Sequence, residues 1–192
     1  MPSDLKLLVD RLRDQPLDLE LDLDPRQLQL VDEEFDFTDR VRGRLTFRMA
    51  GADILAQGDL TARIMGRCVR CLGPAAAEIH VPVTEVWMHG PGRDERGIAA
   101  DADDLDLTRF YTGEEIELAE PLRELIMAEL PDRLYCDPDC KGLCPGCGAN
   151  LNTEPCACSP DVRRQREAGR EPDWKQALKN LHLGDSGGSE RT

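Results

Sequence analysis

The eight cysteines constrain this chain of 192 residues more than any other feature, because they form four closely spaced pairs. Within each pair, one to three residues separate the two cysteines, and such spacing is typical of thiolates that share one metal ion. The segment 136–158 holds six of the eight. The pairs are Cys68 with Cys71, Cys136 with Cys140, Cys144 with Cys147, and Cys156 with Cys158.

Four pairs of thiols suit two sites of four cysteines each. We expect one local site made by the last four cysteines, and a second site in which Cys68 and Cys71 join Cys136 and Cys140. Closing the long loop between Cys71 and Cys136 costs only a few kcal/mol, whereas zinc binding contributes roughly 10 kcal/mol or more. The rival pairing joins the two C-x2-C motifs in one site, as in zinc ribbons, and the sequence leaves that pairing open.

The local geometry of the two C-terminal pairs differs. Cys144-Pro145-Gly146-Cys147-Gly148 has the form of a metal knuckle, in which Pro and Gly shape a tight turn that presents both sulfurs to one ion. Cys156 and Cys158 are only two residues apart, which is about 6.5 Å in an extended strand. Two sulfurs on one zinc ion lie about 3.8 Å apart. The backbone is therefore predicted to turn at this pair.

The ligand set predicts a structural metal rather than a catalytic one. Catalytic zinc keeps an open position and usually has His or carboxylate ligands, whereas four thiolates close the site. The three histidines, His80, His89 and His182, are not near the cluster in the sequence, and no motif for a nucleophilic triad, phosphate loop or dinucleotide site is present. We therefore expect no catalytic residue and one or two structural zinc ions. Two alternatives stay open: a thiol redox protein or sensor that uses Cys68 and Cys71, and an iron-sulfur protein.

The composition predicts a soluble protein in the cytoplasm. The formal net charge is −14, and 32% of the residues are charged. No run approaches the roughly 20 apolar residues that a membrane span requires, and the N-terminal residues lack the apolar region of a signal peptide. A reducing compartment makes clustered cysteines better candidates for metal ligands than for disulfides.

Apolar residues alternate with polar ones in four segments, which predicts an antiparallel β meander. The segments are 17–24, 41–49, 53–68 and 77–88, and Pro82 indicates an edge strand or a bulge in the last of them. From Leu118 to Leu130 the apolar spacing becomes helical, and Pro131 ends that stripe. The predicted fold class is therefore α+β, an antiparallel meander packed by one long helix.

The pattern divides the chain into four predicted parts. Residues 1–132 form the sheet and helix domain, and 133–160 form the cysteine-rich segment that binds metal. Residues 161–183 form a basic linker and a short C-terminal helix, in which Asp173 is the expected cap. The low-complexity residues 184–192 are expected to be disordered.

Two basic stretches interrupt this acidic chain. Because alternate residues of a strand share a face, Arg42, Arg44 and Arg48 are predicted to lie on one side of the second strand. A segregated basic face can bind RNA even in an acidic protein, although solvated charges that merely balance one another are an equally good interpretation. The candidate RNA-binding residues are Arg42, Arg44, Arg48 and Arg63 of the sheet and Arg163, Arg164 and Arg166 of the tail.

Four sequence blocks in a fixed order resemble the YceD family of large ribosomal RNA subunit accumulation proteins. They are CVRCLGP, the L-x3-I-x3-LP stripe, CDPDCKGLCPGCGANLN followed by CAC, and DWKQALKNL. The resemblance as a whole spans roughly residues 17–183. The resemblance implies a bacterial or organellar, non-enzymatic factor needed for normal levels of large-subunit ribosomal RNA. The implied partners are that RNA, a ribosomal protein or an assembly intermediate, without a membrane or a small-molecule substrate.

Overall fold

The computed structural model of the chain describes residues 5–90 and 109–159. The chain divides into two compact units, Met1–Pro138 and Asp139–Thr192. The first unit contains all the strands and helices given below, and the second contains the last five cysteines. The predicted C-terminal helix and tail fall outside the described residues.

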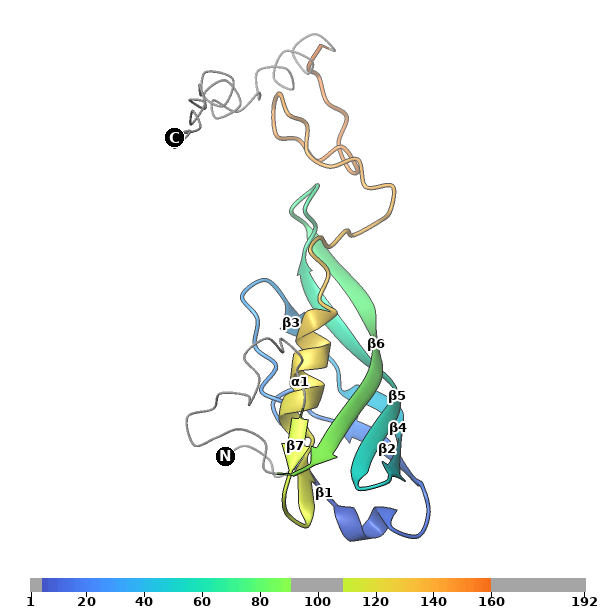
Figure 1. Cartoon of the computed structure of the whole chain (residues 1–192). Coiled ribbons are helices and arrows are strands. Elements are labelled where there is room, and N and C mark those ends of the chain that lie inside the picture. Colours follow the sequence, from blue (N-terminus) through green and yellow to red (C-terminus); the bar gives the residue numbers. More distant parts are fainter. Residues whose placement is uncertain (1–4, 91–108, 160–192) are drawn as a thin grey trace, which may run out of the picture. The chain divides into compact units, whose positions relative to one another are not determined.

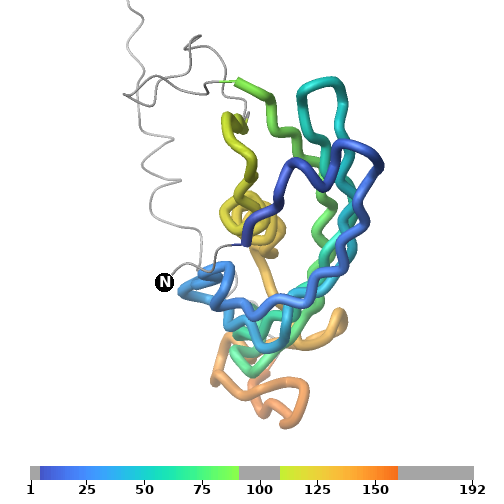
Figure 2. Tube along the Cα trace, turned by 90° about the horizontal axis from the view of Figure 1, so that it is seen from below, coloured from blue at the N-terminus to red at the C-terminus, as the bar shows by residue number. Residues whose placement is uncertain are grey.

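A strongly curved sheet forms the body of the first unit (Figures 1 and 2). Its main order is β2-β4-β5-β6-β7, and β3 pairs with β5 beyond the end of the β4 pairing. The bounds are β2 (Leu17–Leu23), β3 (Asp36–Phe37), β4 (Val41–Ala50), β5 (Asp53–Arg67), β6 (Pro74–His89) and β7 (Arg109–Tyr111). The four predicted strands are thus present as β2, β4, β5 and β6, and consecutive members of this set pair antiparallel.

The prediction of a purely antiparallel meander was incomplete. The short strand β7 pairs parallel to β6, which makes the sheet mixed. A second, two-stranded sheet joins β1 (Lys6–Leu8) to β8 (Glu115–Glu117), and a short 3-10 helix, η1 (Val9–Leu12), follows β1. Strands β1, β7 and β8 have three residues each, too few for a recognisable alternation, so only long-range pairing reveals them.

The alternating sequence explains which face of the sheet is buried. In β4 and β5 the apolar side chains at every second position are almost fully buried, as at Val41, Phe47 and Ile64. The intervening charged residues stay exposed, as expected for an antiparallel sheet with one wet face. Pro82 lies opposite Asp59 of β5, while β7 reaches only residues 87–89 of β6. The outer side of β6 at Pro82 is therefore an edge, where the missing N–H costs no ladder hydrogen bond.

Two glycines allow β4 and β5 to approach closely. A Cβ at Gly43 would lie 2.0 Å from the carbonyl oxygen of Asp59, and one at Gly58 would lie 2.0 Å from that of Arg44. Gly58 also has φ +154°, which L side chains rarely adopt. Glycine inside a strand often marks such close contacts and bends.

One helix, α1 (Ala119–Ala128), packs on the concave face of the sheet (Figure 2). It buries Pro121, Leu122 and Ile126, and it contacts β6. The prediction of a long helix was wrong, because α1 has only ten residues. The apolar stripe ran from Leu118 to Leu130, but Leu118 is the residue before the helix and Leu130 lies in the turn after it. Pro131 disfavours helical geometry at Leu130, and this contributes to the early end.

Candidate metal centres

The sulfurs of the eight cysteines form two groups of four in the structure. Within each group all four sulfurs lie within 4.8 Å of one another. The first cluster contains Cys68, Cys71, Cys136 and Cys140, and the second cluster contains Cys144, Cys147, Cys156 and Cys158. This is the first of the two pairings considered from the sequence, and the structure does not bring the two C-x2-C motifs into one group.

The distances between sulfurs suit a shared ion better than disulfide bonds. The sulfurs of Cys71 and Cys136 are 3.6 Å apart, and those of Cys147 and Cys156 are also 3.6 Å apart. A disulfide requires about 2.05 Å, whereas two thiolates on one tetrahedral zinc ion lie about 3.8 Å apart. Each cluster can therefore hold a metal ion with only small movements of the side chains.

The two C-x2-C motifs have the same backbone hydrogen bonds. In the first, the N–H of Cys68 donates to the carbonyl of Gly73, and the N–H of Leu72 donates to the carbonyl of Cys68, both at 2.8 Å. In the second, Cys144 donates to Ala149 and Gly148 donates to Cys144, again both at 2.8 Å. The residue after the second cysteine has a positive φ in each motif, +60° at Leu72 and +77° at Gly148. Both motifs are therefore knuckles of one type, and we call the first, residues 68–73, the N-terminal knuckle.

Contacts within the first unit bring Cys136 to the N-terminal knuckle. The N–H of Val69 donates to the carbonyl of Leu134 at 2.9 Å. The guanidinium of Arg70 lies 4.6 Å from the centre of the Tyr135 ring and donates to the carbonyl of Pro138 at 2.9 Å. These contacts of Arg70 hold the segment that follows α1 against the hairpin of β5 and β6, although the two segments are far apart in the sequence.

Asn152 is a residue of the site that the sequence analysis missed. Its side-chain N–H donates to the sulfur of Cys140 at 3.2 Å, and its side-chain oxygen accepts from the N–H of Lys141 at 2.8 Å. The second bond fixes which end of the amide faces the sulfur, because only the oxygen can accept. The sequence offered no metal-ligand motif at Asn152; the Asn-x-Asn turn between the cysteine pairs was the only available signal.

The surroundings of the sulfurs shift their pKa values in opposite directions. Burial tends to raise the pKa of Cys68, but backbone N–H groups of Cys136 and two other residues donate to its sulfur and lower its pKa from 9.0 to about 6. Hydrogen bonds with the sulfurs of Cys156 and Cys147 raise the pKa of Cys158 to about 12. Four sulfurs this close repel one another as thiolates, so a cation among them is needed for all four to ionise.

The arrangement has the chemistry of closed, structural metal sites. Each cluster offers four sulfur ligands, which is the full coordination of zinc, and leaves no position for a water or a substrate. Cys68, Cys71, Cys140 and Cys144 are buried, while Cys136 and Cys147 are exposed. Iron-sulfur clusters also accept four cysteines, so this ligand set suits them as well as zinc.

The arginines predicted to bind RNA occupy different electrostatic environments. Arg42 forms ion pairs with Asp39 and Asp22, and Arg44 pairs with Glu20. The carboxylates beside them raise the pKa of both arginines. The pairs with Asp22 and Glu20 follow from the register, because these residues of β2 lie directly opposite Arg42 and Arg44 of β4.

The other predicted RNA-binding residues fall into two sets. Arg48 donates to the side chain of Gln57 at 3.2 Å, and Arg63 is exposed on β5. Within the described residues neither of them forms an ion pair with a carboxylate. Arg163, Arg164 and Arg166 lie outside the described residues.

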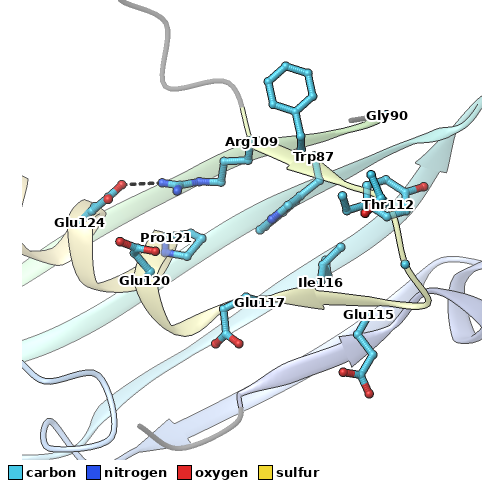
Figure 3. A pocket seen from close by; sticks show the side chains of 13 residues that line it. Trp87, Gly90, Arg109, Thr112, Glu115, Ile116, Glu117, Glu120, Pro121 and Glu124 are labelled. Atoms are coloured by element: carbon cyan, nitrogen blue, oxygen red, sulfur yellow. Dashed lines mark hydrogen bonds and ion pairs between the residues drawn. The ribbon is translucent and has the colours of Figure 1, made fainter. Parts of the chain in front are cut away.

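A groove of about 650 Å³ lies beside α1, β7 and β8 in the first unit (Figure 3). Arg109 crosses one side of it and bonds to Glu85 and to Glu124, each at 2.7 Å. The side chains of Arg109 and Glu85 are only 16% and 14% exposed, so this pair is largely desolvated. The lining also includes Glu115, Glu117 and Glu120. An acidic lining repels phosphate, so this groove is not a candidate RNA contact.

In the part of the chain that the structure describes, the curved mixed sheet, the helix α1 packed on it and the two closed cysteine clusters define a small β-sheet protein with structural metal-site geometry. The helices among the described residues are too short or too polar to cross a lipid bilayer. The family described as "Large ribosomal RNA subunit accumulation protein YceD" matches residues 56–182, about two thirds of the chain. The protein belongs to the YceD family.

Curated relatives resemble parts of the chain. An uncharacterised protein of Mycobacterium tuberculosis is 32% identical over 102 residues, which cover 53% of this chain and 47% of that protein. The chloroplastic YCED homolog 1 of Zea mays, a large ribosomal RNA subunit accumulation protein, is 47% identical over 47 residues, or 24% of this chain and 16% of that protein. The homolog 1 of Arabidopsis thaliana is 38% identical over 58 residues, or 30% and 17%. The chain thus matches less than half the length of these relatives, and no solved structure matches it.

Proposed function

We propose that this protein is a non-enzymatic factor that promotes the accumulation of large-subunit ribosomal RNA or the assembly of the large subunit, with structural zinc in both clusters. Membership of the YceD family supports the role in RNA accumulation. The observation that carries the zinc proposal is the grouping of eight sulfurs into two sets of four, each able to saturate one ion. The cytoplasm is the proposed compartment.

Zinc would act here by joining segments that are distant in the sequence. In the first cluster it would link the N-terminal knuckle to the chain after α1, and in the second it would close the loop from Cys144 to Cys158. Structural zinc contributes directly to folding free energy, because the unfolded chain has no preformed site. The residues that would hold it are the eight cysteines named above.

Metal counting on the full-length protein, purified without a metal-binding tag, tests this proposal. We expect two zinc ions per chain and no visible absorbance. Cys71→Ser and Cys147→Ser should each remove about one ion. If the purified protein is brown and contains iron, the clusters hold an iron-sulfur group instead of zinc. A reduced, folded protein that contains neither metal would overturn the structural-metal proposal.

RNA is the proposed partner, bound in part by the exposed arginines of β4 and β5 and by the arginines of the tail. Arg48 and Arg63 are the better candidates on the sheet, because phosphates would have to displace carboxylates from Arg42 and Arg44. Replacing Arg42, Arg44, Arg48 and Arg63 with Glu should weaken binding to purified 23S ribosomal RNA and lower its salt dependence. Unchanged affinity and salt slope would remove the sheet face from the proposal, and the same assay on an Arg163, Arg164 and Arg166 variant tests the tail.

A basic ribosomal protein is the alternative partner within the same function. The glutamates of the groove in Figure 3 favour it, because charge complementarity steers a cationic segment toward an acidic surface. Copurification from cells distinguishes the two partners by whether ribonuclease treatment releases the bound material.

The four-part division of the chain, at residues 132, 160 and 183, is also a proposal. Limited proteolysis of the zinc-loaded protein should leave 1–160 intact and cut within 161–192. Early cleavage between 133 and 160 would contradict it.

A further inference from the structure

The groove of Figure 3 is bordered by two strands that each have one unpaired edge. It lies between β7 and β8, which the segment 112–114 connects. Among the described residues β7 pairs only with β6, and β8 pairs only with β1. Unpaired N–H and C=O groups along a strand edge are a template for a further extended strand. This feature of the backbone is independent of the charge of the groove.

The hydrogen bonds between β1 and β8 identify the unpaired groups of β8. The N–H of Val9 donates to the carbonyl of Glu114 at 2.8 Å, so these two residues form a bonded pair. Bonded and non-bonded pairs alternate along an antiparallel ladder, and the main-chain groups of Glu115 and Glu117 therefore point away from β1. In the part of the chain that the structure describes, no hydrogen bond reaches these groups. Two residues of β8 thus offer main-chain donors and acceptors at its outer edge.

The side chains along this edge are acidic. Glu115 and Glu117 are both exposed, and they share one face of β8 because they are two residues apart. Glu120, in the first turn of α1, is also exposed. Glu115 forms an ion pair with Lys6 at 3.3 Å. Glu117 and Glu120 form no ion pair with any described cation.

The cations beside the groove do not neutralise it. Arg109 is only 16% exposed and bonds to two carboxylates, each at 2.7 Å, and Lys6 has one carboxylate partner. The formal charge of the groove's charged side chains is −3, because five carboxylates face two cations. These side chains are Glu85, Glu115, Glu117, Glu120, Glu124, Lys6 and Arg109.

Charge and strand geometry together select the kind of occupant. The acidic groove repels the phosphates of RNA. Residues 91–108 contain six acids and two bases, so like charge disfavours this segment as well. A second copy that paired at β8 would bring acidic side chains opposite one another, which destabilises a sheet. A strand with Lys or Arg at alternate positions would instead place cations opposite the glutamates while its main chain pairs.

We propose that this groove binds an extended, cationic segment of a partner protein, which adds as a strand to the outer edge of β8. Lys or Arg side chains of the segment lie opposite Glu115 and Glu117, and its main chain bonds to the N–H and C=O groups of these two residues. The alternate side chains point to the other face of the strand, where Ile116 lines the groove. This inference rests on the proposed function and specifies where its protein partner binds.

Isothermal titration of the zinc-loaded, full-length protein with end-blocked heptapeptides tests the charge. The peptide Lys-Val-Lys-Val-Lys-Val-Lys should bind and should weaken as salt is added, whereas the peptide with Glu in place of Lys should not bind. Glu117→Gln combined with Glu120→Gln removes two charges, and glutamine can still accept the N–H of Ala119 as Glu117 does. The affinity of this double variant for the lysine peptide should fall roughly threefold to thirtyfold.

A matched control separates the groove from the overall charge. Glu33→Gln combined with Glu34→Gln also removes two exposed carboxylates, and neither residue lines the groove. This control should bind the lysine peptide like the native protein. If the groove variant also binds like the native protein, or if the control weakens binding equally, the groove is the wrong site.

Peptides with N-methyl groups test the strand pairing. In an extended strand the N–H groups of alternate residues point to opposite edges, so only one set can face β8. N-methylation of the lysines and N-methylation of the valines are therefore tested separately. One of them should weaken binding by about tenfold or more, and the other should change it by less than about twofold. Equal effects of both would contradict strand addition.

Other occupants give different results. If replacing Arg163, Arg164 and Arg166 with Gln raises the peptide affinity, the tail of this chain occupies the groove and the partner inference is overturned. Dissociation of a dimer by the lysine peptide would assign the groove to a second copy, and weaker 23S RNA binding by the groove variant would assign it to RNA.

Failure of this inference is distinct from failure of the proposed function. Normal 23S ribosomal RNA levels in cells that lack the protein would overturn the proposed function. Lowered 23S levels in such cells, together with no binding of the lysine peptide to the purified protein, would overturn only the groove inference.

Discussion

Replacing Asn152 with leucine should weaken metal binding at the first cluster while the second cluster keeps its affinity. The side-chain amide of Asn152 donates to the sulfur of Cys140 at 3.2 Å, so it stabilises the thiolate that a metal requires. Leucine has a similar size but no N–H, and it leaves the N–H of Lys141 without its acceptor. Asn152 lies between the cysteines of the second cluster but is not one of its ligands.

The magnitude follows from the type of hydrogen bond. A hydrogen bond to a charged group contributes about 1.5–3 kcal/mol, which corresponds to roughly a 10-fold to 100-fold change in affinity. Residues that bond to metal ligands typically have effects of this size when replaced. We therefore expect one of the two zinc affinities to fall by roughly 10-fold to 100-fold in Asn152→Leu.

Competition with a chelator of known affinity measures this change on the full-length protein. The native protein should lose zinc in two phases, and Cys71→Ser identifies the phase of the first cluster by removing it. Thr153→Val is the matched control, because the Thr153 hydroxyl bonds to the carbonyl of Asn150 at 3.4 Å in the same turn and does not contact a sulfur. If Asn152→Leu leaves both phases unchanged, or shifts only the second, the role assigned to this hydrogen bond is wrong.

Three further predictions concern stability and pH. Gly58→Ala should lower the free energy of unfolding by about 2 kcal/mol or more, because the added Cβ would lie 2.0 Å from a main-chain oxygen. The control Gly51→Ala, where a Cβ meets nothing within 4 Å, should lower it by only about 1 kcal/mol. Equal losses of stability in urea denaturation would contradict the clash at Gly58. Arg109→Met should lower the free energy of unfolding by about 3 kcal/mol in the same urea measurement, because it leaves the partly buried carboxylates of Glu85 and Glu124 without their cation. A loss below about 0.5 kcal/mol would show that these ion pairs are effectively solvated. As the pH falls, the second cluster should release zinc before the first, because the raised pKa of Cys158, about 12, lets protons compete strongly for that sulfur, although the pKa of Cys144 in the same cluster is lowered. In the first cluster the pKa of Cys68 is lowered to about 6, which weakens this competition. A zinc-sensitive dye follows the release, and a reversed order would contradict this assignment.

Much of the sheet could be predicted because its information is local. The alternation in residues 17–24, 41–49 and 53–68 places buried and exposed side chains correctly in β2, β4 and β5, since neighbours in a strand point to opposite faces. The length of the helix could not be read in the same way. Leu118 and Leu130 continue the apolar spacing of α1 and lie just outside it, so spacing alone overestimates the helix.

The electrostatic state of the predicted basic face depended on strand register. The sequence places Arg42 and Arg44 on one side of a strand, but it does not say which residues lie opposite. In the folded chain Asp22 and Glu20 of β2 occupy those positions, and the arginines are already paired. A pattern within one strand carries no information about its cross-strand partners.

The sequence by itself determined that the cysteines come in pairs with metal-ligand spacing and that the closed thiolate set suits a structural ion, because both depend on residue type and short separations. Only the tertiary structure decided which pairs share a cluster. The N-terminal knuckle and Cys136 meet because the β5–β6 hairpin and the segment after α1 hydrogen-bond to each other through Val69, Leu134 and Arg70. Contacts between segments this distant in the chain arise from the packing of the whole domain, which no local pattern records.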